Sequence, residues 1–342
     1  MNISDIAKLA GVGVGTVSRV LNDHPDVKDE TREKVLAIIK KSNYIPNNSA
    51  RNLKKTHTNS IGVLVRGVFN PLFSEMIDEI SKKIVSSGYV MILQHNDYSN
   101  QEELFNMISF VKERKLQGLI YLGCNLADMD AKTFENIDIP VVLTSVNTVY
   151  DNKISNFSSI GIENSKAAFN ATKYLIDLGH KEIGIVLGDK NDIGISRERF
   201  LGYIEALIEN NLLFDEEKVV YGDYSSRGAY EATLELIQKN KNLTAVFCIS
   251  DIMAIGASRA IFDSGLKVGE DISIIGFDGM DVVEFNVPAI TTIEQPRREM
   301  SEMSVDLLLS LLKNKAENKH IVLETKLIER QSCKKISNER GN

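Results

Sequence analysis

The chain has 342 residues, a quarter of them charged and 43% hydrophobic, which is typical of a soluble globular protein of two or three domains. No run approaches the roughly 20 apolar residues of a membrane span, and the first ten residues lack the basic start and apolar core of a secretory signal. Three scattered cysteines, Cys124, Cys248 and Cys333, indicate a reducing compartment and argue against disulfides or a zinc site. We therefore expect a cytoplasmic protein that is not bound to a membrane and requires no metal and no cofactor.

Charge is distributed unevenly along the chain. Residues 1–60 hold ten lysines and arginines against six aspartates and glutamates, whereas the remainder holds 30 basic against 41 acidic residues. A basic head on an acidic body indicates that the head alone meets a polyanion, because a polyanion repels the body. A solvated basic helix face would give the same count, so charge leaves both interpretations open.

The first forty residues predict three short helices. In SDIAKLAG, Ile6, Leu9 and Ala10 share one face, Ser4 is the expected N-cap and Gly11 ends the helix. In VGVGTVSRVLN the apolar stripe is Val14, Val17, Val20 and Leu21. The third helix, DETREKVLAIIKK, begins at Asp29 or Glu30 and buries Val35, Ile38 and Ile39. Two helices joined through a glycine turn, with a third completing the core, form a helix-turn-helix.

Glycines at positions 11, 13 and 15 also suggest a phosphate-binding loop. A dinucleotide fingerprint needs G-x-G-x-x-G directly after a strand, and a Walker loop needs a lysine beside Ser or Thr. Neither pattern is present in AGVGVGTVSRVLN, and a helix comes before it. The other side of the second helix presents Gly15, Thr16, Ser18, Arg19 and Asn22, which suit phosphate oxygens and base edges in a major groove.

The segment NYIPNNSARNLKK follows the third helix. Pro46 favours extended geometry at Ile45, and Asn47 is a suitable cap for a helix of about two turns. So short a helix is unstable alone, so we expect it to order only on a template. Taken alone, the segment is better described as a plain linker.

The stretch ISDIAKLAGVGVGTVSRVLN, followed by YIPNNSARNLKK and IGVLV, resembles the LacI family of bacterial repressors, and the likeness runs from residue 3 to about 330. The resemblance implies that the second helix enters the major groove and that paired hinge helices insert Leu53 into the minor groove, as an apolar wedge would. It also marks Gly13 and Gly15 as departures, since relatives commonly carry Ser and Ala or a larger residue there. The DNA-binding residues that it implies are Ser4, Val14, Gly15, Thr16, Ser18, Arg19, Asn22, Thr31, Tyr44, Asn47, Ala50, Leu53 and Lys54.

From Ile61 onward, apolar β-rich runs alternate with helical stretches. Strands are predicted at 61–65, 89–95, 118–123, 141–146, 183–189, 245–250 and 273–279. Nearly continuous apolar strands separated by helices indicate two parallel sheets covered on both faces, so the fold class is α/β. The resemblance implies a two-lobed, doubly wound effector domain of the periplasmic-binding-protein-like type I class.

The implied domain boundaries follow from the same resemblance. A helix-turn-helix domain spans 1–46, a hinge helix and linker 47–59, the effector-binding and dimerisation domain 60–332, and a polar tail 333–342. Within the effector domain, the N-lobe is expected at about 60–159 and 291–318, and the C-lobe at about 160–290 and 319–332.

Ligands of open α/β sheets lie beyond the carboxyl ends of the strands, so the candidate effector site falls in the loops there. An arginine and a carboxylate facing each other bind hydroxyl-rich or purine-like ligands, and the resemblance singles out Arg199 and Asp278. The full set of predicted effector-binding residues is Phe69, Asn70, Phe73, Ser145, Arg197, Arg199, Ser250, Asp251 and Asp278. Relatives that sense sugars often carry Asp-Arg where this chain has Ser145 and Val146, and Asn where it has Ser250. A sugar or sugar derivative is the leading hypothesis.

Three classes of function are compatible with parts of this pattern. The first is a repressor that binds palindromic double-stranded operator DNA as a homodimer and is released by a small-molecule effector. A corepressor, either purine-like or a protein, would act with the opposite sign. The second is a solute-binding protein, which the basic head and missing signal argue against. The third, an enzyme, is rejected because the sequence has no HExxH, no GxSxG and no metal-spaced His/Cys cluster.

Overall fold

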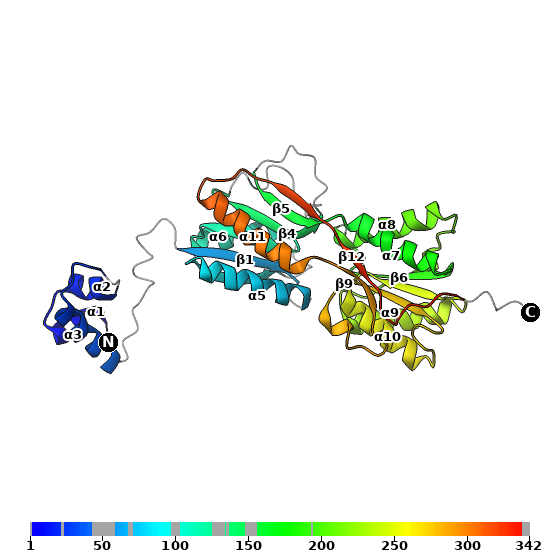
Figure 1. Ribbon diagram of the computed structural model, residues 1–342, viewed down its shortest axis with the longest axis horizontal. Helices are drawn as coiled ribbons and strands as arrows, with labels where there is room; N and C mark the ends of the chain where they lie inside the picture. Colours follow the sequence, from blue (N-terminus) through cyan, green and yellow to red (C-terminus); the bar gives the residue numbers. More distant parts are fainter. Residues whose placement is uncertain are drawn as a thin grey trace, which may run out of the picture. The chain divides into compact units, whose positions relative to one another are not determined.

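The computed structural model describes residues 2–21, 24–42, 59–67, 71–96, 103–124, 134, 137–147, 156–192 and 194–336. Contacts divide the chain after Thr58 into a small helical unit and a larger α/β unit, each described by itself (Figure 1). The hinge predicted at 47–59 lies outside the described residues, apart from Asn59.

The helical unit contains α1 (Ile3–Ala10), α2 (Val14–Leu21) and α3 (Asp29–Lys41). Gly11 ends α1 in the left-handed conformation with φ of 67°, which glycine adopts at no steric cost. The three helices enclose one small core, formed by Ile6, Ala7, Ala10, Val17, Val20, Val27 and Val35. The predicted helix-turn-helix is confirmed.

Two details of α1 differ from the prediction. The N-cap is Asn2 rather than Ser4: the Asn2 side chain accepts hydrogen bonds from the amides of Ser4 (2.9 Å) and Asp5 (3.1 Å), and the Asp5 carboxylate accepts one from the Asn2 amide (2.8 Å). This capping box satisfies orphan amides of the first turn and fixes the helix start two residues earlier. The buried face then includes Ala7, while Leu9 is 57% exposed.

The N-lobe is built on a six-stranded sheet in the order β11-β5-β4-β3-β1-β2, with every pairing parallel. Apolar side chains alternate between its faces, so α5 (Pro71–Ser86) and α11 (Arg297–Leu312) pack on one face and α6 (Glu103–Arg114) on the other. The strands are β1 (Ser60–Arg66), β2 (Val90–Asn96), β3 (Gly118–Leu122), β4 (Val141–Asn147), β5 (Ser158–Ile162) and β11 (His320–Leu323).

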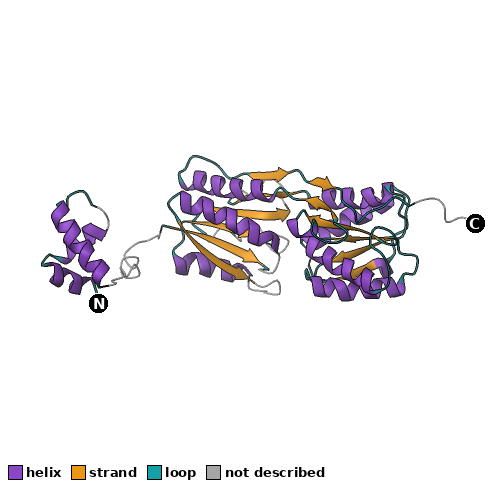
Figure 2. Cartoon of the chain, turned by 60° about the horizontal axis from the view of Figure 1, so that its bottom comes forward, coloured by secondary structure: helices purple, strands orange, loops and turns teal. Residues whose placement is uncertain are grey.

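The C-lobe is built on a second six-stranded sheet in the order β12-β10-β9-β8-β6-β7, in which only β12 is antiparallel. Helices lie on both sides of this sheet (Figure 2). Its strands are β6 (Ile183–Leu187), β7 (Val219–Tyr221), β8 (Ala245–Cys248), β9 (Ser273–Asp278), β10 (Thr291–Glu294) and β12 (Lys326–Ile328). Its helices are α7 (Asn164–Asp177), α8 (Ile195–Glu209), α9 (Ser226–Lys239) and α10 (Asp251–Asp263), with short turns η2 (Glu216–Lys218) and η3 (Asp281–Val283).

The chain crosses between the lobes three times, a few residues later than predicted. Strand β5 still belongs to the N-lobe, β10 belongs to the C-lobe although it was expected in the N-lobe, and β11 returns to the N-lobe before β12 re-enters the C-lobe. The crossings therefore follow Ile162, Glu294 and Leu323. These four strands were not predicted because each is only three to five residues long, too short to stand out as an apolar run.

The start of the predicted polar tail is part of the C-lobe. The Cys333 thiol donates to the carbonyl of Ile274 (3.0 Å), and the Lys334 and Ile336 amides donate to Ser273 Oγ (3.1 Å) and the Leu178 carbonyl (2.8 Å). These bonds attach residues 333–336 to the amino-terminal edge of the second sheet, so the tail prediction holds at most from residue 337, outside the described residues.

We predict that Gly202→Ala destabilises the larger unit by about 1–3 kcal/mol. A Cβ at Gly202, inside α8, would overlap the carbonyl oxygen of Ser165 on α7, so the two helices must separate. Thermal unfolding of the full chain should show a lower Tm. The control is Gly15→Ala, because no atom lies within 4 Å of the added Cβ. Amide exchange should show that the free energy of opening α2 rises by about 0.5–1 kcal/mol. An unchanged Tm for Gly202→Ala would refute the close packing of α7 on α8.

Candidate functional site

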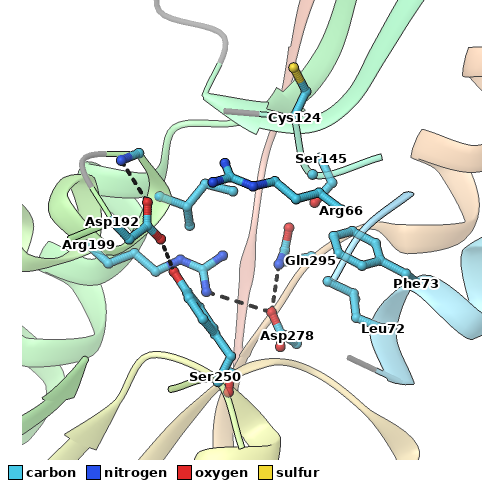
Figure 3. A pocket seen from close by; sticks show the side chains of 14 residues that line it. Arg66, Leu72, Phe73, Cys124, Ser145, Asp192, Arg199, Ser250, Asp278 and Gln295 are labelled. Atoms are coloured by element: carbon cyan, nitrogen blue, oxygen red, sulfur yellow. Dashed lines mark hydrogen bonds and ion pairs between the residues drawn. The ribbon is translucent and has the colours of Figure 1, made fainter. Parts of the chain in front are cut away.

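The two lobes face each other across a cavity at the carboxyl ends of their strands, the position expected for a ligand in parallel α/β sheets (Figure 3). The cavity volume is about 50 Å³, which holds only a few water molecules. A larger ligand therefore requires the lobes to part or side chains to move. The lining residues are Arg66, Leu72, Phe73, Gly123, Cys124, Ser145, Asp192, Gly194, Ile195, Arg199, Tyr224, Ser250, Asp278 and Gln295.

Arg199 is held rigidly at the floor of this cavity. Its Nε donates to Asn164 Oδ1 (3.0 Å) and its Nη1 to the carbonyl of Ile249 (2.5 Å). The guanidinium lies 3.5 Å from the centre of the Phe277 ring, a cation–π arrangement that strengthens when water is excluded. Arg199 therefore enters the cavity as a fixed donor rather than a flexible side chain.

Asp278 faces Arg199 at the end of β9. Its Oδ1 lies 3.8 Å from Arg199 Nη1 and accepts a hydrogen bond from Gln295 Nε2 (2.7 Å). Its Oδ2 is buried and has no hydrogen-bond partner. Burial raises the pKa of this carboxyl to about 6, although Arg199 and the Gln295 bond oppose the rise. A buried acceptor without a donor is costly, so Asp278 Oδ2 is the atom that a ligand hydroxyl would satisfy.

Asp251 does not line the cavity, in contrast to the prediction. It begins α10 with Ser250 as its N-cap, and its carboxylate accepts from the Thr292 hydroxyl (2.6 Å) and the Met280 amide (2.7 Å). Burial, and then the charge of Asp278, raise the pKa of Asp251 to about 8. Its role is to fix the turn that follows Asp278, while Ser250 lines the cavity as predicted.

The other predicted effector residues divide into three groups. Phe73 and Ser145 line the cavity; Ser145 reaches it through a bulge in β4, where its φ is 57°. Arg197 is exposed and outside the cavity, because residues two apart on α8 point to different sides of the helix. Phe69 and Asn70 lie outside the described residues.

Several cavity residues were missed by the sequence analysis. Arg66 ends β1, Cys124 lies two residues after β3, and Gln295 directly follows β10. The rule that the carboxyl ends of strands line the site could have identified all three residues. Gln295 was not considered because β10 was not predicted. Asp192 and Tyr224, joined by a short hydrogen bond from the Tyr224 hydroxyl, lie in longer loops and gave no local signal.

In the helical unit, the predicted DNA-reading side of α2 is accessible. Ser4, Val14, Gly15 and Arg19 are exposed, and Thr16, Ser18 and Thr31 are half-buried. Val14 is 43% exposed, so it belongs to this side rather than to the core stripe. Asn22, Tyr44, Asn47, Ala50, Leu53 and Lys54 lie outside the described residues.

Comparison with known proteins identifies both units. Residues 2–47 match the model of bacterial regulatory proteins of the lacI family, and residues 172–333 match the periplasmic binding protein-like domain. The HTH-type transcriptional regulator MalR of Clostridium butyricum is 54% identical over 97% of this chain and 99% of its own length. The chain belongs to the LacI family. This LacI-family regulator is also 34% identical to the HTH-type transcriptional repressor PurR of Pectobacterium carotovorum, over 96% of both chains.

Solved structures support the same assignment for the LacI-family regulator. The lac repressor dimer bound to operator and the anti-inducer ONPF has a TM-score of 0.81 at 28% identity, covering 98% of this chain and 99% of that one. The complex of the transcriptional regulator CelR with cellobiose has a TM-score of 0.71 at 28% identity, covering 97% and 99%. The relatives of this chain are transcriptional regulators, so this protein is a regulator and not an enzyme. Among the described residues, no helix is long and apolar enough to cross a bilayer.

We predict that Asp251→Asn reduces the loss of stability at high pH. The folded pKa of Asp251, about 8, exceeds the unfolded value of about 3.9. Below pH 4 the protonated Asp251 therefore costs no stability. As the pH rises from 4 toward 8, the free energy of unfolding falls by up to about 1.4 kcal/mol per pH unit, because only the unfolded state loses the proton. Asparagine cannot ionise, yet it keeps an acceptor for the Met280 amide.

Urea unfolding of the full chain at pH 5, 7 and 9 measures this effect. The control is Asp263→Asn, at the exposed end of the same helix. If wild type and Asp251→Asn lose stability equally between pH 5 and 9, Asp251 does not carry the titration.

Proposed function

We propose that this LacI-family regulator is a cytoplasmic repressor that binds a two-fold operator as a homodimer and is released when a sugar or sugar derivative occupies the cleft between its lobes. Relatives support two parts of this proposal: the lac repressor was solved as a dimer on operator, and CelR was solved with cellobiose. The helical unit supplies the DNA-binding surface through the accessible side of α2.

The pairing of Arg199 with Asp278 carries the effector part of the proposal. Arg199 presents fixed N–H donors, and Asp278 Oδ2 is an acceptor that needs a donor. A sugar hydroxyl both accepts and donates, so adjacent hydroxyls satisfy the two residues together. Leu72 and Phe73 contribute an apolar wall from the N-lobe, which suits the C–H face of a sugar ring.

A contact path connects Asp278 with the N-lobe. Arg297, at the start of α11, donates to the carbonyl of Gly279 (2.7 Å) and pairs with Glu75 of α5 (3.2 Å). Met280, which follows Gly279 in the chain, is buried in the N-lobe core. A ligand that moves Asp278 therefore moves the turn on which the N-lobe rests, which gives effector binding a differential contact between two lobe arrangements.

The described surface also offers apolar area for a second copy of the chain. Val90 and Leu93, on the edge strand β2, are 59% and 50% exposed, and Phe285 and Val287, in the loop before β10, are 81% and 93% exposed. Exposed apolar side chains on a sheet edge favour pairing with another chain. These residues support the dimer part of the proposal.

The second candidate function is that of a corepressor-dependent regulator. Its support is the 34% identity with PurR and the purine-like ligands that an arginine and a carboxylate also suit. The two candidates differ in sign, because an inducer lowers operator affinity and a corepressor raises it.

We predict that Arg199→Ala keeps operator affinity within about twofold and abolishes the response to effector, because the substitution removes the cleft donors but leaves α2 unchanged. The operator is first selected from random DNA with the wild-type protein. DNA release is then titrated by fluorescence anisotropy with Arg197→Ala, outside the cavity, as the control. A normal response of Arg199→Ala would show that the effector binds elsewhere.

We predict that Leu53→Ala weakens specific binding at least tenfold and leaves most non-specific binding, since an apolar wedge acts only where the duplex can be bent. Gel shifts at fixed salt, on the selected operator and on scrambled DNA, give both affinities. An equal loss of affinity for the operator and for scrambled DNA would refute the role of Leu53 as a wedge.

A further inference from the structure

Among the described residues that line the cavity, each lobe supplies one arginine, and each arginine lies near a carboxylate. Arg199 of the C-lobe faces Asp278. Arg66 of the N-lobe ends β1, and its Nε lies 3.5 Å from Glu103 Oε2, with both side chains only 14% exposed. Figure 3 shows the Arg66 side chain extending into the cavity opposite Arg199 and Asp278.

Glu103 is fixed in place behind Arg66. Its Oε1 accepts a hydrogen bond from the hydroxyl of Tyr121 (2.5 Å), a fully buried residue of β3, and Asn96 Nδ2 donates to that hydroxyl from β2 (3.4 Å). Burial raises the pKa of Tyr121, so its hydroxyl stays protonated and keeps donating. Three elements of the N-lobe thus hold one carboxylate against the arginine that enters the cavity.

Asp192 is the second carboxylate, beside Asp278, among the described residues that line the cavity. Asp192, in the loop before α8, accepts the Tyr224 hydroxyl and the amide of Gly194 (2.8 Å). Within the part of the chain that the structure describes, the charged side chains that line the cavity or form an ion pair with a lining residue are Arg66, Arg199, Asp192, Asp278 and Glu103, so positive charge is not in surplus there. A phosphate ester would bring about two more negative charges beside these buried carboxylates, and unpaired buried charge is strongly unfavourable.

We propose that this charge pairing restricts the cleft to an uncharged, hydroxyl-rich ligand and excludes its phosphate ester, with Glu103 as the residue that determines this choice. The inference rests on the proposed function, because it assumes that the cleft binds the effector. Glu103 neutralises Arg66, the arginine that the described part of the N-lobe places in the cavity. Without that carboxylate, Arg66 would become a phosphate-binding group, since a guanidinium binds phosphate oxygens in a bidentate manner.

The test compares matched ligands on the full-length protein. Glucose, galactose, maltose, cellobiose and trehalose are each titrated beside their 6-phosphate esters, with thermal shift for screening and calorimetry for Kd. The wild type is expected to bind at least one uncharged sugar and to bind its ester at least about tenfold more weakly, because like charges in an interface cost several kcal/mol.

The variant Glu103→Gln keeps an acceptor for Tyr121 and removes the charge. We expect it to lower the preference for the uncharged sugar by about tenfold or more. The control is Asp306→Asn, which removes an equal charge from α11, where Asp306 pairs with Lys83 of α5. It should leave the preference for the uncharged sugar unchanged. Arg66→Gln, a second variant in case the first does not fold, should make the rejection of the ester stronger.

Each other outcome is decisive. Equal or tighter binding of the ester by the wild type overturns the inference while leaving the cleft as the effector site. An unchanged preference in a folded Glu103→Gln protein overturns the role of Glu103. If no sugar and no ester binds, the proposed function itself fails and the inference falls with it.

Discussion

The buried contact between Arg199 and Asp278 is the interaction on which the larger unit depends. Two ions that are 5% and 1% exposed lose more by desolvation than their attraction returns, unless other polar groups bind them. Asn164, Ile249 and Gln295 supply those bonds from behind, while one oxygen of Asp278 is left to whatever enters the cleft. Asp278 also has φ of 121°, a costly backbone conformation for a residue with a side chain, and such strain is characteristic of ligand sites.

The same contact lies at the junction of the two lobes, which gives it consequences beyond binding. Gln295, which orients Asp278, stands on the crossing between β10 and α11. Two residues later Arg297 fixes the carbonyl of Gly279, and Met280 is buried in the N-lobe core. The residues that read the ligand and those that join the lobes are therefore neighbours along the chain. Coupling between ligand and DNA needs only a small displacement here, provided that the two lobe arrangements differ in their affinity for the ligand.

Sequence reasoning recovered what local pattern determines and missed what long-range packing determines. The helix-turn-helix and the seven apolar strands follow from periodicity, and Phe73, Ser145, Ser250 and the pair of Arg199 with Asp278 line the cavity as predicted. Asn2 replaced Ser4 as the cap because the capping box with Asp5 reaches back before the apolar pattern begins. The crossings were misplaced because β10 and β11 are strands of only four residues, which are too short to give an apolar pattern and pair beside longer strands. Arg66 and Glu103 lie 37 positions apart in the sequence, and local pattern does not show that they meet; the pairing of β1 with β2 sets Arg66 opposite Asn96, after which the chain continues to α6 and Glu103.

The most direct measurement is a crystal structure of the full-length protein with the sugar that releases it from operator DNA. The geometry of the cleft predicts a sugar ring between the lobes, with one hydroxyl within hydrogen-bond distance of Asp278 Oδ2 and a neighbouring hydroxyl hydrogen-bonded to Arg199. It also predicts that Arg66 remains beside Glu103. A ligand bound elsewhere, with Asp278 Oδ2 still lacking a donor, would contradict the assignment of the cleft as the effector site.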